Sequence, residues 1–230
     1  MQSTLLLMTV ASLIQGADSG RSAVSFPTAD GGVIHADRYG QGDHAVLLAH
    51  GGRFTRESWV EQAQALAAAG LRVLAIDFRG YGKSKGPGDS EPMSAPLHLD
   101  VLAGVHYLRQ TGAGTVSVVG GSMGGTAAAN ATIAANPGEI DAVVMLAGTT
   151  YGDATRLKGR KLFIIALGDT TGSGALRMTG FRQQYDKAPT PKQLIVLEGS
   201  AHAQYLFQTD QGPRLLQEII RFLSIDRRSD

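Results

Sequence analysis

Short apolar runs recur along the chain, and each is closed by glycine or by polar residues. Runs of this length are typical of strands that are buried on both faces of a sheet. Ahead of them, two extended segments flank Asp30-Gly31-Gly32, a combination that predicts a β-hairpin. The predicted strands are residues 23–26 and 33–38 in the hairpin, then 45–49, 73–76, 116–119, 142–146, 162–167 and 194–197.

Segments with helical character separate most of these runs. Residues 58–69 are rich in alanine and are followed by Gly70, a residue type that commonly ends helices. The other predicted helices are residues 97–110, 126–135, 174–185 and 212–223. Strands that alternate with helices predict an α/β fold, with a mostly parallel sheet and right-handed crossovers flanked by helices. No repeat, low-complexity tract or linker interrupts the alternation, so residues 22–230 are expected to form one domain.

Residues 1–21 are expected to be an N-terminal extension. Their apolar run, residues 5–14, is too short to cross a bilayer and has the length of a signal-peptide core. No Lys or Arg precedes the run and no A-x-A cleavage site follows it, which favours a helix packed on the domain and a cytoplasmic location. The alternative is a cleaved signal segment and a secreted or periplasmic protein. No other segment suggests stable membrane insertion.

The charges nearly cancel, with 21 basic and 20 acidic residues and a net charge of +1. No Lys/Arg tract is present, so nucleic acid is not an expected partner. A small neutral or amphiphilic ligand fits this composition better. The chain contains no cysteine, which excludes disulfides, cysteine zinc sites and a cysteine nucleophile.

One segment, Gly80-Tyr81-Gly82-Lys83-Ser84, is similar to the end of a phosphate-binding loop. That motif needs a glycine where this chain has Asp77, and a helix should begin where Gly86-Pro87-Gly88 follow. No G-x-G-x-x-G pattern follows the first parallel strand either. No nucleotide, metal or other cofactor is therefore expected.

Candidate chemistry centres on Gly120-Gly121-Ser122-Met123-Gly124. The segment lies between a predicted buried strand and a predicted helix, so it reads as a sharp turn that exposes a serine at a helix N-terminus. Glycines flank the serine in such a turn because a Cβ on either side would collide with the backbone. This is the G-x-S-x-G pattern of a nucleophile elbow.

Polar residues also follow other apolar runs, at the strand ends where open parallel sheets bind ligands. Asp169 follows one of the last strands, and His202 follows the final one. The order Ser122, Asp169, His202 is the order expected of a hydrolase built on this elbow. Serine needs an imidazole to accept its proton, and the imidazole needs a carboxylate to orient it. Asp153 is the alternative acid.

A tetrahedral oxyanion needs backbone N–H donors. Met123 supplies one, because it follows the nucleophile at the positive end of a helix. Gly52, in the loop after His50, is expected to supply the second, with Arg53 as the alternative. His50 itself is expected to hold its loop by hydrogen bonds.

Together these residues resemble the α/β-hydrolase superfamily. The motifs that carry the resemblance are His50-Gly51, residues 77–84, residues 120–124, Gly168-Asp169 and residues 199–202, in the family's order. The resemblance covers roughly residues 23–222 and implies an eight-stranded, mostly parallel sheet whose second strand is antiparallel. Many members carry a helical cap after the sixth strand, but only residues 149–160 are available here, so we expect an open site without a cap domain.

The sequence therefore predicts a serine hydrolase that cleaves small-molecule carboxylic esters. A thioesterase, an amide or peptide hydrolase and a dienelactone-type hydrolase share the same machinery, and a non-catalytic binding protein of this fold is the alternative from another class. Substrate-binding residues and the oligomeric state are not specified. Four residues beside the predicted site loops are candidates to line an acyl pocket: Phe54, Tyr81, Met123 and Tyr151.

Overall fold

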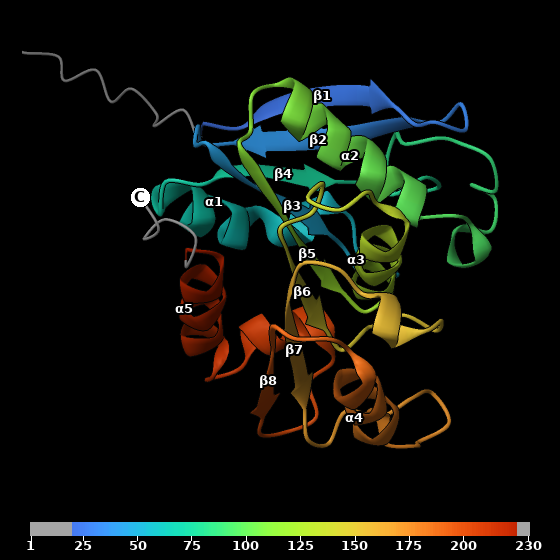
Figure 1. Cartoon of the computed structure of the whole chain (residues 1–230), viewed down its shortest axis with the longest axis vertical. Helices are drawn as coiled ribbons and strands as arrows, with labels where there is room; N and C mark the ends of the chain where they lie inside the picture. The colour runs from blue at the N-terminus through green and yellow to red at the C-terminus, as the bar shows by residue number, and fades with distance from the viewer. Residues whose placement is uncertain (1–19, 225–230) are drawn as a thin grey trace, which may run out of the picture.

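A single mixed sheet forms the centre of the computed structural model, which describes residues 20–224. Its eight strands lie in the order β1-β2-β4-β3-β5-β6-β7-β8 (Figure 1). β2 runs antiparallel to β1 and β4, and every other neighbouring pair is parallel. The predicted fold class is confirmed. The strands are β1 (Ser22–Pro27), β2 (Val33–Tyr39), β3 (His44–Ala49), β4 (Arg72–Ile76), β5 (Thr115–Gly121), β6 (Ala142–Leu146), β7 (Arg160–Ala166) and β8 (Lys192–Leu197).

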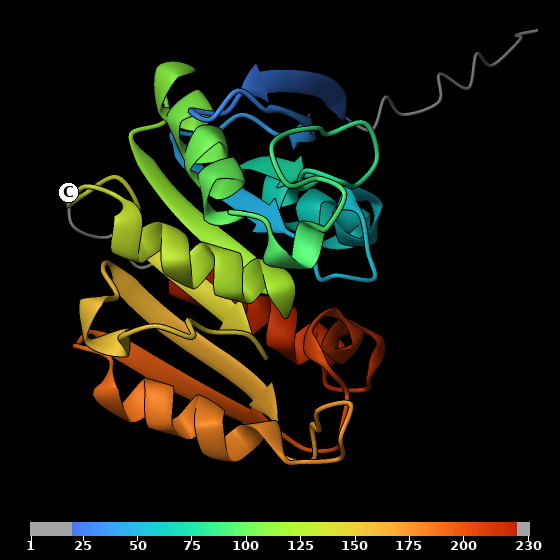
Figure 2. The same cartoon turned by 90° about the vertical axis from the view of Figure 1, so that its right-hand side faces the viewer.

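Within residues 20–224, five α-helices cover the two faces of this sheet. α2, α3 and α4 pack on one face, and α1 and α5 pack on the other (Figure 2). None of the helices within residues 20–224 combines the length and the apolarity needed to cross a membrane. The helices are α1 (Val60–Ala68), α2 (His98–Gln110), α3 (Met123–Ala134), α4 (Arg177–Lys187) and α5 (Gly212–Leu223), with short 3-10 turns η1 (Arg56–Trp59), η2 (Pro92–Ser94), η3 (Ala154–Arg156) and η4 (Ala203–Gln208).

The apolar runs are continuous because both faces of the sheet are covered. In β3, Leu47 packs into the cluster under α2 and α3, while Val46 and Leu48 pack into the cluster under α1 and α5. All three side chains are fully buried. Burial of each such side chain contributes roughly 1.5–3 kcal/mol to folding. The two apolar clusters therefore hold the strand ends, and the loops that follow them, in place.

Two connections bear on the sequence predictions: the one before α4 differs from its prediction, and the one between β6 and β7 agrees with it. α4 begins at Arg177, not at residue 174, because the chain first forms a closed turn. In that turn the Thr171 N–H donates to the Ala175 carbonyl, and Thr170 pairs with Leu176. Between β6 and β7 only η3 interrupts residues 147–159, so no cap domain is inserted there.

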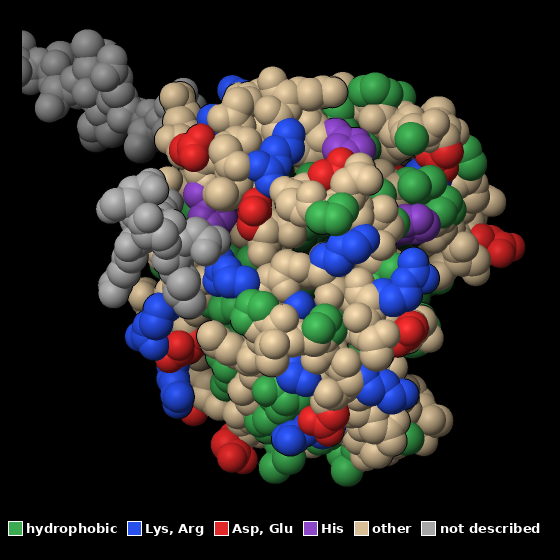
Figure 3. Space-filling view, in the orientation of Figure 1, with side chains coloured by type: hydrophobic (Ala, Val, Ile, Leu, Met, Phe, Trp, Pro, Cys, Tyr) green, Lys and Arg blue, Asp and Glu red, His purple; other side chains and the backbone are tan. Residues whose placement is uncertain are grey.

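The predicted N-terminal extension, residues 1–21, lies outside the described residues except for its last two. On the face drawn in Figure 3, Lys and Arg side chains are interspersed with Asp and Glu side chains. No patch of one charge covers that face, in keeping with the balanced composition.

Candidate active site

The candidate site lies at the carboxyl edge of the sheet. β3, β5, β6, β7 and β8 are neighbours and run parallel, so the loops that follow them emerge at the same edge. His50 follows β3, Ser122 follows β5, Asp169 follows β7, and His202 lies in the loop after β8. The structure thus brings residues from four separate parts of the chain to one place.

Ser122 lies in a strained turn between β5 and α3. Its φ of 51° and ψ of −114° are unusual for a residue with a side chain, a conformation that costs on the order of 1–3 kcal/mol. A Cβ on Gly120 would overlap the Gly124 carbonyl, and a Cβ on Gly124 would overlap the Ala49 carbonyl. The Ser122 N–H donates to the Leu146 carbonyl at 2.8 Å and fixes the turn against β6. The flanking glycines are therefore required by close backbone contacts.

His202 contacts both of the other predicted site residues. Its Nε2 lies 2.8 Å from Ser122 Oγ, and its Nδ1 lies 2.8 Å from Asp169 Oδ2. A carboxylate only accepts hydrogen bonds, so Nδ1 carries the proton and Nε2 is left to accept the serine hydrogen. Asp169 is 1% exposed, whereas the His202 side chain is 29% exposed and open to a ligand.

Asp169, and not Asp153, is the carboxylate that meets His202. The Arg177 Nε lies 3.5 Å from the second Asp169 oxygen, and the Arg177 N–H donates to the Asp169 carbonyl at 2.9 Å. Asp153 is exposed, and its Oδ1 accepts hydrogen bonds from the N–H and hydroxyl of Thr155. Those bonds lower the pKa of Asp153 and keep its carboxylate at the start of η3. The alternative acid is therefore used as a local turn cap.

Gly52 and Met123 lie close together beside the elbow. A Cβ placed on Gly52 would be 3.7 Å from Met123 Sδ, and the Tyr81 hydroxyl contacts both residues, donating to the Gly52 carbonyl at 2.9 Å. Met123 is the first residue of α3, where backbone N–H groups face outward and the helix dipole favours negative charge. Arg53, the alternative donor, is exposed. Gly52 and the first residue of α3 therefore lie side by side next to Ser122.

His50 holds the loop that carries Gly52. Its Nδ1 lies 2.9 Å from the Gly51 carbonyl, and its Nε2 accepts a hydrogen bond from the Phe78 N–H at 3.2 Å. These partners require a neutral ring with the proton on Nδ1. His50 is fully buried, and burial lowers its pKa. Its contacts are those of a residue that orders the loop.

Gln204 is a site residue that sequence reasoning missed. It is 4% exposed and lies two residues after His202. Its Oε1 accepts a hydrogen bond from the Gly51 N–H at 2.6 Å, and its Nε2 donates to Ser58 Oγ at 2.5 Å. It therefore ties the histidine loop to the loop of Gly52. A glutamine in a short 3-10 turn belongs to no motif, so no sequence signal identifies it.

A second serine–histidine pair lies in the body of the protein. His44 Nε2 is 2.9 Å from Ser117 Oγ, but His44 is 6% exposed and Ser117 is fully buried. His44 begins β3 and pairs in register with Thr115, at the amino end of the strands. This pair is therefore remote from the carboxyl edge and closed to a ligand.

A small pocket adjoins the elbow and runs along α3. Its volume is about 170 Å³, and we call it the α3 pocket. Met123 and Tyr151, two of the predicted acyl-pocket residues, line it, whereas Tyr81 bonds to Gly52 and Phe54 packs on Tyr205 with ring centroids 5.1 Å apart. The pocket is lined by Met93, Ala95, Leu97, His98, Met123, Thr126, Ala127, Asn130 and Tyr151.

Charged residues near the site form hydrogen bonds and ion pairs that hold its loops in place. Asp77 accepts a hydrogen bond from the Arg56 N–H at 2.7 Å, and the fully buried Arg79 pairs with Asp100 and Asp30, both at 2.6 Å. Within residues 20–224, no three or more His, Asp or Glu side chains gather in a way that could hold a metal ion. Asp77, Asp30 and Asp100 are instead paired with arginines.

Comparison with known proteins gives a match over most of the chain. A family model described as the alpha/beta hydrolase fold matches residues 44–229. An esterase of Pyrococcus furiosus superposes with a TM-score of 0.73 at 20% identity, covering 89% of this chain and 92% of that one. At this identity the structural likeness shows a shared fold.

Two sequence relatives differ in how much they share. An epoxide hydrolase of Caballeronia sordidicola is 37% identical over 102 residues, which are 44% of this chain and 30% of that protein. A Rattus norvegicus protein named as a candidate protein-lysine deacylase, ABHD14B, is 28% identical over 187 residues, 78% of this chain and 84% of that protein. The chain spans less than two thirds of the length of the first curated relatives that it matches.

Proposed function

Because the chain belongs to the alpha/beta hydrolase family, we propose that it is a serine hydrolase that cleaves carboxylic esters by acyl transfer. The observation that carries the proposal is the pair of 2.8 Å contacts that link Ser122, His202 and Asp169. A serine activated by a neutral imidazole, itself oriented by a buried carboxylate, is the arrangement that nucleophilic acyl transfer requires.

In the first half of the reaction, Ser122 Oγ attacks the ester carbonyl while His202 Nε2 takes its proton. The carbonyl oxygen becomes an oxyanion, which the N–H groups of Gly52 and Met123 stabilise. His202 then passes the proton to the departing alkoxide, and an acyl ester on Ser122 remains. Asp169 stabilises the imidazolium that forms between the two proton transfers.

In the second half, water attacks the acyl-enzyme. His202 takes a proton from the water as it adds to the acyl carbonyl, and the same two N–H groups hold the second oxyanion. Collapse of this intermediate returns the proton to Ser122 Oγ and releases the carboxylic acid. No cofactor takes part in the proposed cycle.

A serine nucleophile argues against epoxide opening, the activity named for the Caballeronia sordidicola relative and for others. Attack of a serine hydroxyl on an epoxide carbon would form an ether, which water does not hydrolyse, so the enzyme would not turn over. Amide deacylation is the second candidate, because the rat relative that is covered over most of its length is named for that activity. The same three residues would serve it, with an amine as the leaving group.

The test is whether Ser122 is a nucleophile. A fluorophosphonate probe should label the wild-type protein, and Ser122→Ala should remove both the label and the hydrolysis of p-nitrophenyl acetate, by about 10⁴-fold or more. Ser117→Ala, in the buried second pair, is the matched control and should keep both. A folded wild-type protein that takes up no label would favour a binding protein of this fold.

A comparison of two substrates distinguishes an ester hydrolase from an amide hydrolase. An acetyl-lysine peptide and a p-nitrophenyl ester are compared at equal concentrations of the wild-type enzyme. Ester turnover that depends on Ser122, without release of acetate from the peptide, would select the ester hydrolase.

A further inference from the structure

The α3 pocket begins at the proposed oxyanion site. Met123 lines the pocket and is also one of the proposed oxyanion donors. Met93 lines it as well, and its Sδ lies only 3.1 Å from where a Cβ on Gly52 would stand. The two methionines therefore connect the carbonyl-binding position to the mouth of the pocket.

From that mouth the pocket follows one face of α3. Met123, Thr126, Ala127 and Asn130 are spaced three, four and seven residues along the helix, the spacing of a single face. Seven residues of helix span about 10 Å. The pocket is thus a short trough that leads away from Ser122.

The direction of the trough distinguishes the two halves of an ester. The departing alcohol must receive its proton from His202, so it leaves on the side of the loops after β7 and β8. The lining residues come from the segment after β4, from α3 and from the loop after β6, and none comes from those two loops. The group that enters the trough is therefore the one attached to the carbonyl carbon.

The lining also specifies chemistry. Leu97 and Ala127 are buried apolar walls, and none of the described residues that line the pocket is Asp, Glu, Lys or Arg. Burial and, to a smaller extent, the Arg79 charge lower the pKa of His98, so its ring is neutral near neutral pH. At the far end, Asn130 Oδ1 accepts a hydrogen bond from the Thr150 hydroxyl at 2.7 Å, which leaves the Asn130 NH2 as a donor.

We propose that the α3 pocket binds the acyl group and selects a short uncharged chain, no longer than the roughly 10 Å trough, that ends in a hydrogen-bonding group. A longer chain would leave the trough and meet solvent beside Tyr151, which is 91% exposed. A terminal carboxylate would lose hydration without gaining a cation. This inference rests on the proposed ester hydrolase function.

The first experiment measures kcat/KM for p-nitrophenyl acetate, hexanoate and decanoate. Wild-type enzyme should prefer hexanoate and lose about 10-fold or more at decanoate. Two variants fill the pocket: Ala127→Leu at its buried wall and Thr126→Leu at its more exposed rim. Each should lower the ratio of kcat/KM for hexanoate to kcat/KM for acetate about 10-fold or more, while acetate is still hydrolysed.

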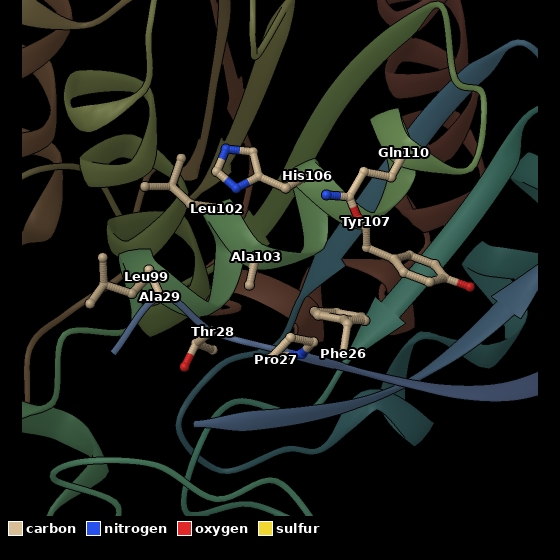
Figure 4. Close-up of a pocket in the computed structure, with 10 residues that line it drawn as sticks. All are labelled: Phe26, Pro27, Thr28, Ala29, Leu99, Leu102, Ala103, His106, Tyr107 and Gln110. Carbon is tan, nitrogen blue, oxygen red and sulfur yellow. The ribbon is translucent and has the colours of Figure 1, made fainter. Parts of the chain in front are cut away.

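The matched control uses a second pocket, which lies between α2 and β1. Ala103 is a buried alanine on α2 that lines a pocket of about 300 Å³ against Phe26 and Thr28 (Figure 4). That pocket shares no residue with the α3 pocket. Ala103→Leu should therefore leave the hexanoate-to-acetate ratio of the wild-type enzyme unchanged.

The second experiment varies the end of the chain. The p-nitrophenyl ester of 6-hydroxyhexanoate should react about 10-fold or more faster than the mono-p-nitrophenyl ester of adipate, whose chain ends in a carboxylate. Asn130→Leu should reduce the preference for 6-hydroxyhexanoate over hexanoate by about 5-fold, the size of one lost hydrogen bond.

The outcomes separate the two proposals. A protein that takes up no fluorophosphonate and cleaves no ester would overturn the proposed function together with this inference. An enzyme that is labelled and active, but whose filling variants slow acetate and hexanoate equally, would overturn the acyl-pocket inference alone. Equal rates with the hydroxyl and carboxylate termini would overturn the selection for uncharged chains.

Discussion

The side-chain carbonyl of Gln204 accepts a hydrogen bond from the N–H of Gly51 at 2.6 Å, across 153 positions of sequence. The same amide donates to Ser58, whose hydroxyl donates to the Thr55 carbonyl at 2.7 Å. One buried glutamine thus sets the distance between the loop of His202 and the loop of Gly52. In the proposed mechanism, it positions the second oxyanion donor relative to the base.

We expect Gln204→Met to lower kcat about 10- to 100-fold with little change in KM. The substitution removes the acceptor for the Gly51 N–H. The loop that carries the proposed donor Gly52 then shifts away from the oxygen on which negative charge develops in the transition state. Gln204→Glu keeps that acceptor and should recover part of kcat. Gln208→Met, at an exposed position in the same 3-10 turn, is the control. A rise in KM at constant kcat would contradict a positioning role.

Asp169→Asn should lower kcat by about 10⁴-fold for ester substrates. An amide in place of the carboxylate favours the wrong histidine tautomer and no longer stabilises the imidazolium. Steady-state kinetics of the purified variant measures the effect. Asp153→Asn, at the alternative acid, should retain nearly full activity, and a large loss there would contradict the assignment of Asp169.

Asp100→Ala should destabilise the protein by about 3–5 kcal/mol, because it leaves the buried Arg79 guanidinium without one of its two carboxylate partners. Urea unfolding followed by circular dichroism gives the free energy of unfolding. Glu218→Ala breaks a surface pair with Arg221 and should change that free energy by no more than about 0.5 kcal/mol. Similar losses in both variants would argue against a buried charge as the cause.

The free energy of unfolding should fall between about pH 7 and about pH 5. Burial lowers the pKa of His50 in the folded protein, whereas the unfolded imidazole titrates near 6.5. Below pH 6.5 the unfolded state therefore binds more protons, and the contribution of His50 falls by at most about 1.4 kcal/mol per pH unit. Well above pH 6.5 neither state is protonated, and the contribution is constant.

His50→Gln tests this linkage, because glutamine can donate and accept without titrating. The variant should show a shallower loss of stability as the pH falls. His98 contributes in the same direction, since burial lowers its pKa as well, so some slope should remain. His106→Gln, at a half-exposed position, is the control, and an unchanged slope in His50→Gln would contradict the prediction.

The order of strands and helices follows from local chain properties. An apolar run closed by glycine, such as residues 45–49, is buried on both faces wherever helices cover the sheet, so its length and pattern predict the strand. The start of α4 was predicted three residues early, because the Thr171–Ala175 turn depends on backbone hydrogen bonds that no residue pattern announces.

The chain by itself determined the elbow around Ser122, because only glycine tolerates the backbone contacts on either side of it, and it placed candidate residues at the ends of parallel strands. Tertiary structure alone decided that Asp169 meets His202 while Asp153 caps a turn. It also decided that Gln204 bridges two loops and that a pocket opens along α3. These features depend on distances between segments that lie far apart in the sequence, and such distances are set only when the two apolar clusters pack on the sheet.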